Sequence, residues 1–168
     1  MAAADRNERH DDYTADLRAE QADHAERAEL DGHGCVQQEL TVQLVLSPER
    51  SLPVPALLAY CWEDPYAVHV TFHLGQDSPV TWVFARELLV EGVFRACGTG
   101  DVRIWPSRAD GRSLICLALS SPAGEALLEA PAAPVATWLE QTLRVVPTGT
   151  ESSAMDLDAE LAALLGSA

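Results

Sequence analysis

The stretch "ELTVQLVLS" (residues 39–47) alternates apolar and polar side chains with a period of two. This alternation is typical of a β-strand that buries one face and exposes the other. Leu40, Val42, Leu44 and Leu46 would share the buried face. The stretch therefore predicts a half-buried strand, and the chain on its C-terminal side continues in the same pattern.

Turn signals divide the following residues into further strands. Pro53 and Pro55 lack the N–H that a central strand needs, so they predict an edge or the start of a strand. "EDPY" (residues 63–66) is typical of a turn, and Asp110-Gly111 is a strong hairpin signal. A short helix is expected to end near Gly92. The strands expected after residue 47 are 56–62, 67–74, 80–84, 101–107 and 113–120.

The sequence predicts helices in the last part of the chain, from residue 121 onward. "SPAGEALLEAP" (residues 121–131) has Ser121 where an N-cap is favoured and Pro122 at the first helical position, so it predicts a helix. Residues 133–146 carry a helical apolar stripe, and residues 155–165 carry another. Strands followed by helices predict an α+β fold, a single domain with antiparallel sheet and C-terminal helices.

Charge and composition separate an N-terminal extension from this domain. Residues 1–34 hold ten acidic residues, four arginines and few large apolar side chains, and we expect them to be disordered. Residues 35–168 are expected to form the domain. The formal net charge of −15 disfavours nucleic acids and anionic membranes as partners. No signal peptide or membrane-spanning run is apparent, which predicts a cytoplasmic protein without membrane insertion.

The four cysteines, Cys35, Cys61, Cys97 and Cys116, contain no C-x-x-C pair. This spacing predicts neither a zinc knuckle nor a redox dithiol. In a reducing compartment we expect four buried thiols and no disulfide.

No group of residues predicts an enzyme. His69 and His73 lie four apart on a strand, which separates their rings by roughly 13 Å, too far for one metal ion. The serines of "ALSSP" lack a nucleophile elbow, and the carboxylates Glu63 and Asp64 lie in a solvated turn. We expect no catalytic residue, no cofactor and no metal.

"CGTGDVRIWPSR" (residues 97–108) raises two binding hypotheses. A phosphate loop needs its glycines between a strand and a following helix, but these precede a strand, so Gly98 and Gly100 predict a turn. Arg103 and Trp105 lie two apart and share one face, as a base-stacking platform requires. Because the chain is acidic, a protein interface is the favoured interpretation.

Several blocks of the sequence resemble the SsgA-like proteins, which are sporulation-specific cell-division proteins of actinomycetes. The similar blocks are "SLPVPALLAYCWEDPYAVHVTFH", "VTWVFARELLVEG", "GTGDVRIWPS", "ALSSPAGEALLEAP", "PTGTE" and "MDLDAEL". The resemblance implies a whirly-like fold, a homo-oligomer expected to be a trimer, and no enzymatic activity. It implies that the protein positions or recruits the septation machinery or wall-remodelling proteins at division septa. The implied partners are the tubulin-like FtsZ or SsgA/SsgB-like paralogues.

Five residues within these blocks are candidates for partner or subunit contacts, because each is aromatic or has a polar tip. They are Tyr66, Arg86, Arg103, Trp105 and Arg108. Sheet packing is the alternative for Tyr66 and Trp105, and pairing within the fold is the alternative for Arg86. A single-stranded nucleic-acid-binding protein of whirly-like fold is the alternative function.

Overall fold

A computed structural model describes residues 35–75 and 79–154. The expected N-terminal extension (1–34) and the helix expected at 155–165 lie outside the described residues. Within them, one seven-stranded antiparallel sheet has the strand order β4-β3-β2-β1-β7-β6-β5. Its strands are β1 (Cys35–Ser47), β2 (Arg50–Cys61), β3 (Ala67–Phe72), β4 (Val80–Ala85), β5 (Val102–Ala109), β6 (Arg112–Ser121) and β7 (Gly124–Pro131). The predicted α+β class is confirmed.

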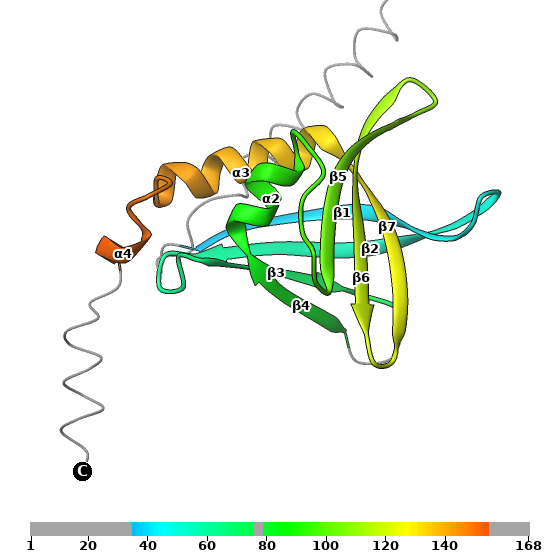
Figure 1. Cartoon of the computed structure of the whole chain (residues 1–168), viewed down its shortest axis with the longest axis horizontal. Coiled ribbons are helices and arrows are strands. Elements are labelled where there is room, and N and C mark those ends of the chain that lie inside the picture. The colour runs from blue at the N-terminus through cyan, green and yellow to red at the C-terminus, as the bar shows by residue number, and fades with distance from the viewer. Residues whose placement is uncertain (1–34, 76–78, 155–168) are drawn as a thin grey trace, which may run out of the picture. The chain divides into compact units, whose positions relative to one another are not determined.

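Helices α2 (Arg86–Gly92) and α3 (Ala132–Val145) pack against one face of this sheet, and the short α4 (Glu151–Ala154) follows α3 (Figure 1). The core lies between the sheet and these helices. At its centre are the fully buried side chains of Trp138 from α3, Tyr60 from β2 and Ile104 from β5. The indole N–H of Trp138 donates to the Val36 carbonyl at 3.2 Å, which ties α3 to β1.

The alternation that predicted the strands is confirmed for most positions. Val42, Val68, Val70 and Phe72 are buried, whereas Leu46 at the end of β1 is 49% exposed. The alternation cannot show where a strand leaves the core, so it placed Leu46 on the buried face.

The prolines of β2 lie where the strand has one neighbour. Residues Ala56 to Ala59 pair with β3, whereas Pro53 and Pro55 have β1 as their one neighbouring strand. The Pro55 carbonyl accepts one further hydrogen bond, from the His73 N–H just past the end of β3, at 2.9 Å. β2 is central in the sheet, but its first half is a local edge. This position agrees with the predicted edge and not with the predicted start of a strand, because β2 already begins at Arg50.

The helix predicted over residues 121–131 is wrong, because this segment is β7. Ser121, Pro122, Ala123 and Gly124 form a tight turn in which the Ser121 hydroxyl accepts the Ala123 N–H. β7 then pairs with β6 over its whole length and with β1 at Leu127 to Glu129. Serine and proline suit a turn as well as a helix start, and the alternating burial of Leu128 and Ala130 decides for the strand.

The prediction of no disulfide is also wrong. Cys35 and Cys61 are directly opposite each other in the β1–β2 register and are joined by a disulfide. Their separation of 26 residues carried no signal, because only the hairpin register brings them together. Cys97 and Cys116 are free thiols, and burial raises the pKa of both. Raised values disfavour the thiolate and so disfavour a nucleophilic role.

Candidate contact surface and its internal anchor

The turn in "CGTGDVRIWPSR" is built by backbone contacts. Cys97 and Ile104 exchange two N–H to carbonyl hydrogen bonds, of 2.9 and 3.0 Å, and so close a loop between them. Gly98 has φ of +90°, which glycine adopts without strain. The predicted glycine turn into a strand is confirmed, and β5 begins at Val102.

Arg103 and Trp105 lie on the outer face of the sheet, which is the face opposite the core. Across this face the register aligns Arg103 with Ala118 of β6, Leu127 of β7 and Val45 of β1 in one row. A hollow of about 520 Å³ is lined by these four residues and by Trp105. Sequence spacing alone predicted that Arg103 and Trp105 share a face, but the apolar floor depends on the register of three other strands.

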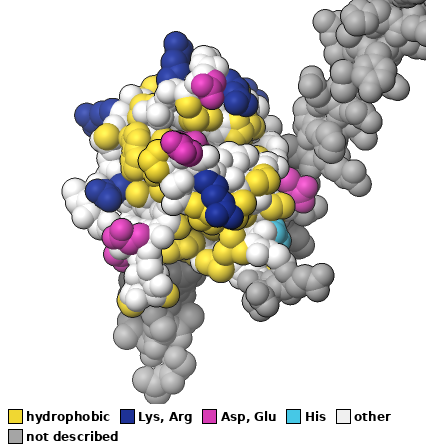
Figure 2. All heavy atoms as spheres, turned by 90° about the vertical axis from the view of Figure 1, so that its right-hand side faces the viewer, with side chains coloured by type: hydrophobic (Ala, Val, Ile, Leu, Met, Phe, Trp, Pro, Cys, Tyr) yellow, Lys and Arg dark blue, Asp and Glu magenta, His cyan; other side chains and the backbone are white. Residues whose placement is uncertain are grey.

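Charges around this hollow are mixed. Arg103 is exposed and forms no ion pair with any described residue, whereas Asp101 and Glu125 also line the hollow. Figure 2 shows arginine side chains among hydrophobic patches on the side where the ends of the β1–β2 and β5–β6 hairpins lie. On a chain of net charge −15, this mixture of arginine, tryptophan and aliphatic side chains is typical of a protein contact surface.

Tyr66 lies apart from Arg103 and Trp105. It occupies the turn between β2 and β3, is 51% exposed, and lines a second hollow of about 280 Å³ with Ala85, Glu87 and Gly149. The structure therefore separates the five predicted residues. Arg103 and Trp105 share the outer face, whereas Arg108, near the end of β5, has the strand phase of the core-facing Val102 and Ile104. Tyr66 and Arg86 lie apart from both.

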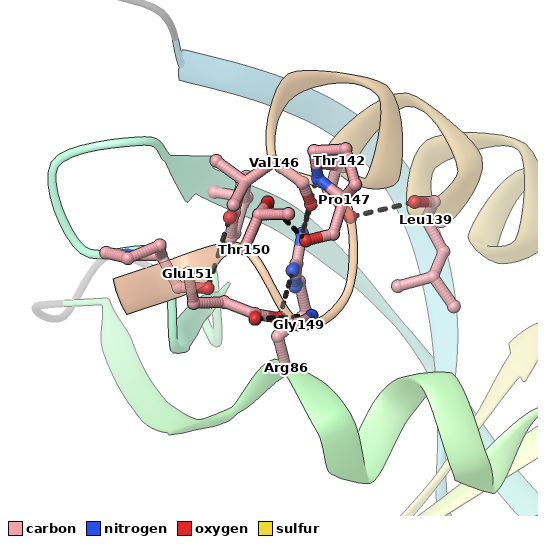
Figure 3. Close-up of polar contacts among 10 residues, drawn as sticks. Arg86, Leu139, Thr142, Val146, Pro147, Gly149, Thr150 and Glu151 are labelled. Carbon is pink, nitrogen blue, oxygen red and sulfur yellow. Dashed lines mark hydrogen bonds and ion pairs between the residues drawn. The ribbon is translucent and has the colours of Figure 1, made fainter. Parts of the chain in front are cut away.

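Arg86 is buried and points into the fold, with 2% of its surface exposed. Its guanidinium donates to the carbonyls of Thr142 (3.1 Å) and Val146 (2.7 Å) and to the Glu151 carboxylate (2.8 Å) (Figure 3). It also stacks over the Tyr60 ring at 4.7 Å. The side chain is not available to a partner, and pairing within the fold is the interpretation that the structure supports.

Helix electrostatics explain this position of Arg86. A cation in the first turn of α2 is unfavourable, because that end of a helix carries positive potential. The guanidinium is turned to the C-terminal end of α3, where the potential is negative. There it donates to the Val146 carbonyl, at the end of the helix, and is a second donor to the Thr142 carbonyl, which also accepts the Val146 N–H. Arg86 thereby fastens α2 to the end of α3 and to α4.

Glu151 completes this arrangement. Its own backbone N–H lowers the pKa of its carboxyl group, and hydrogen bonds from Arg86 and from the Gly149 N–H lower it further, which together outweigh the opposing effect of desolvation. The carboxylate is therefore held in the charged form that Arg86 needs. Sequence reasoning missed Tyr60, Thr142 and Glu151, and the one available signal was an arginine at a helix start.

Neither a metal centre nor a membrane span is found among the described residues. No group of three or more His, Cys, Asp or Glu side chains in residues 35–75 and 79–154 could hold a metal ion. Within the same residues, no helix is long and apolar enough to cross a membrane.

Comparison with known proteins identifies the family. The family described as "Streptomyces sporulation and cell division protein, SsgA" matches residues 54–151. The chain belongs to the SsgA family. The SsgA-family resemblance expected from the sequence is thus confirmed.

The relatives of this SsgA-family chain include proteins named sporulation-specific cell division protein SsgB. SsgB of Streptomyces coelicolor is 58% identical over 130 residues, which cover 77% of this chain and 95% of that protein. SsgB of Thermobifida fusca is 46% identical over 124 residues, covering 74% and 90%.

Solved structures of SsgA-family proteins have the same fold. One comes from work on SsgB mutations that correlate with longitudinal cell division during sporulation of Streptomyces coelicolor. It has a TM-score of 0.70 at 57% identity and covers 72% of this chain and 95% of that one. An SsgA-like protein of Thermobifida fusca has a TM-score of 0.71 at 42% identity, with 80% and 98% covered.

Proposed function

We propose that this chain is a non-enzymatic regulator of sporulation-specific cell division that positions or recruits septation or wall-remodelling proteins. FtsZ or SsgA/SsgB-like paralogues are the proposed partners. Membership of the SsgA family supports the process. The single observation that supports a contact role is the outer-face hollow, where Arg103 and Trp105 adjoin the apolar row of Ala118, Leu127 and Val45.

This hollow suits protein recognition because its parts complement one another. Ala118, Leu127 and Val45 offer half-buried apolar surface, Trp105 offers a large rigid side chain, and Arg103 offers donors for a carboxylate. All of them project from paired strands, so no backbone segment has to be ordered when a partner binds. Arg108 does not line this hollow, and its position three residues after Trp105 places it on the opposite side of β5.

The proposal also states the domain organisation of the chain, its place in the cell and its oligomeric state. Residues 35–168 form the family domain, and the acidic residues 1–34 are an extension whose composition suits disorder. The protein acts in the cytoplasm at division septa, as a homo-oligomer that we take to be a trimer.

The test in cells replaces the gene in its sporulating host. We expect deletion to disturb the ladders of fluorescent FtsZ, and the wild-type gene to restore them. Arg103→Glu should fold normally but fail to restore regular ladders, because loss of a central contact weakens partner binding about 30-fold. Arg144→Glu, which changes an exposed arginine on α3, should restore them.

Two results would restrict or contradict the proposal. Normal ladders after deletion, with defective spore walls, would assign the chain to wall remodelling instead of septum placement. Full restoration by Arg103→Glu would show that the partner binds elsewhere.

Nucleic-acid binding is tested separately. A fluorescent single-stranded oligonucleotide should show no saturable binding to the full chain at about 150 mM salt, because the protein is strongly acidic. Fluorescence anisotropy measures this over a range of salt concentrations. Binding that persists at about 150 mM and weakens steeply with added salt would favour the nucleic-acid alternative.

A further inference from the structure

The two edges of the sheet differ in how they are protected. The β5 edge carries the Cys97–Ile104 bridge, contains Pro106, and contacts α2. β4, with the sequence VTWVFA, has no charge and no proline, and it pairs with β3 along its whole length. Among the described residues, no strand pairs with its other side (Figure 1). Natural proteins normally blunt such an edge, since it is a template for another strand.

The backbone groups that β4 leaves free can be assigned from one hydrogen bond. The Arg86 N–H donates to the Tyr66 carbonyl at 2.8 Å, and this bond sets the phase of the β3–β4 ladder. In an antiparallel pair, bonded and non-bonded positions alternate. Thr81 and Val83 therefore direct their N–H and carbonyl groups away from β3, to the open edge. Ala85 directs its N–H to the same edge, whereas its carbonyl, at the N-cap of α2, accepts the first hydrogen bond of that helix.

Side chains next to this edge are apolar and exposed. Val83 is 53% exposed on the outer face, and Val80 is 42% exposed at the start of the strand. A strand added to β4 would cover both valines and hydrogen-bond to the three free positions. Burial of apolar surface and ladder formation would thus act together, as in other cases of strand addition.

The second hollow lies at the end of this edge. It is lined by Ala85, the last residue of β4, and by Tyr66, Glu87 and Glu151. Arg86 is already bonded to Glu151, so Glu87 is the carboxylate of this hollow that has no ion pair with a described residue. An exposed tyrosine ring beside a carboxylate suits a lysine or arginine side chain.

We propose that β4 accepts an extended segment of a partner protein as an eighth strand, apolar at alternate residues and with a lysine or arginine beside Ala85. Charge complementarity selects this occupant. The edge is neutral, its end is acidic, and the chain has a net charge of −15, so a neutral-to-basic segment is favoured over a second copy of this acidic chain. The inference rests on the proposed contact function and adds a second surface to it.

The test exploits a substitution that removes one outward N–H and leaves the β3 ladder intact. Random heptapeptides displayed on phage are selected against the full chain, and the enriched peptide is synthesised. We expect alternating apolar residues with a basic end. Val83→Pro should weaken its binding at least about tenfold, whereas Val83→Thr, which keeps the N–H, should not. Thr81→Pro is a second variant at another outward position.

Hydrogen exchange supplies an independent readout. The amides of Thr81, Val83 and Ala85 should exchange fast in the free protein and slow down when the synthetic peptide binds, and Glu87→Gln should weaken peptides with a basic end. Failure to enrich any peptide, or binding that Val83→Pro and Thr81→Pro leave unchanged, would overturn the proposal. The proposal would also be overturned if these amides exchanged slowly in the absence of peptide and Val83→Pro dissociated an oligomer. A second copy of the chain would then occupy the edge.

Cell experiments separate this inference from the proposed function. One outcome is that deletion of the gene abolishes the FtsZ ladders while a strain that carries Val83→Pro keeps them regular. That pair of results would refute strand addition and leave the proposed function standing. Normal ladders after deletion would refute the role in septum placement alone, because binding of the synthetic peptide is measured without cells.

Discussion

Replacement of Arg86 by alanine should lower the free energy of unfolding by about 3 kcal/mol, because a buried guanidinium is lost together with its charged hydrogen bonds, which contribute about 1.5–3 kcal/mol each and are not additive. The variant leaves the Val146 carbonyl without the guanidinium donor and Glu151 without its ion-pair partner, and the Thr142 carbonyl keeps only the Val146 N–H. It also removes the cation from the Tyr60 ring. Urea unfolding of the full chain, followed by circular dichroism, measures the change.

Arg95→Ala is the matched control. Arg95 also forms a 2.8 Å ion pair, with Glu91 four residues earlier, but its side chain is 75% exposed. Exposed pairs of this kind contribute less than about 1 kcal/mol. Equal effects of Arg86→Ala and Arg95→Ala would show that Arg86 does not anchor the helices.

The pH dependence identifies the contribution of Glu151. Because the folded protein lowers the pKa of this carboxyl group below its ordinary value of 4.5, its contribution to stability is present above that value. It is lost as the pH falls through the folded pKa. The stability difference between wild type and Arg86→Ala should therefore shrink below about pH 4.5. A difference that stays constant down to pH 3 would assign the effect of Arg86 to the carbonyls and Tyr60 alone.

Local patterns predicted most of the sheet because strand alternation and turn chemistry are properties of adjacent residues. β3, β4, β5 and β6, the Asp110-Gly111 hairpin and the end of α2 near Gly92 all follow from such patterns. The failure at residues 121–131 has a physical cause as well. Ser-Pro followed by alanine and glutamate satisfies the preferences of a helix start, but pairing of β7 with both β6 and β1 outweighs that local preference.

The contact surface and its anchor depended on long-range pairing. Arg103 and Trp105 were found from their spacing, whereas Val45 and Leu127 join them only through the β1–β7 register. Arg86 was predicted to contact a partner, but it forms hydrogen bonds inside the fold. A polar residue in a block that resembles a family can do either. The hydrogen-bond partners of Arg86 lie 56 to 65 residues away in sequence, and no local pattern records them.

Replacement of Gly98 by alanine should destabilise the fold by about 3 kcal/mol. A Cβ atom at this position would lie 2.2 Å from the Val102 carbonyl oxygen, and the φ of +90° is strained for any L side chain. Positive-φ strain and overpacking each cost on the order of 1–3 kcal/mol. Since this loop fixes where β5 begins, the variant should also displace Arg103 and weaken partner binding.

Gly100→Ala supplies the control two residues away in the same loop. Its Cβ would meet no atom within 4 Å, and its φ is not in the positive range, so we expect a change within about 0.5 kcal/mol. Urea unfolding of both variants, with amide exchange of β5, measures stability and the order of the strand together. If Gly98→Ala matched Gly100→Ala in stability, the loop would be free to rearrange. The position of Arg103 and Trp105 on the outer face would then rest on β6 pairing alone.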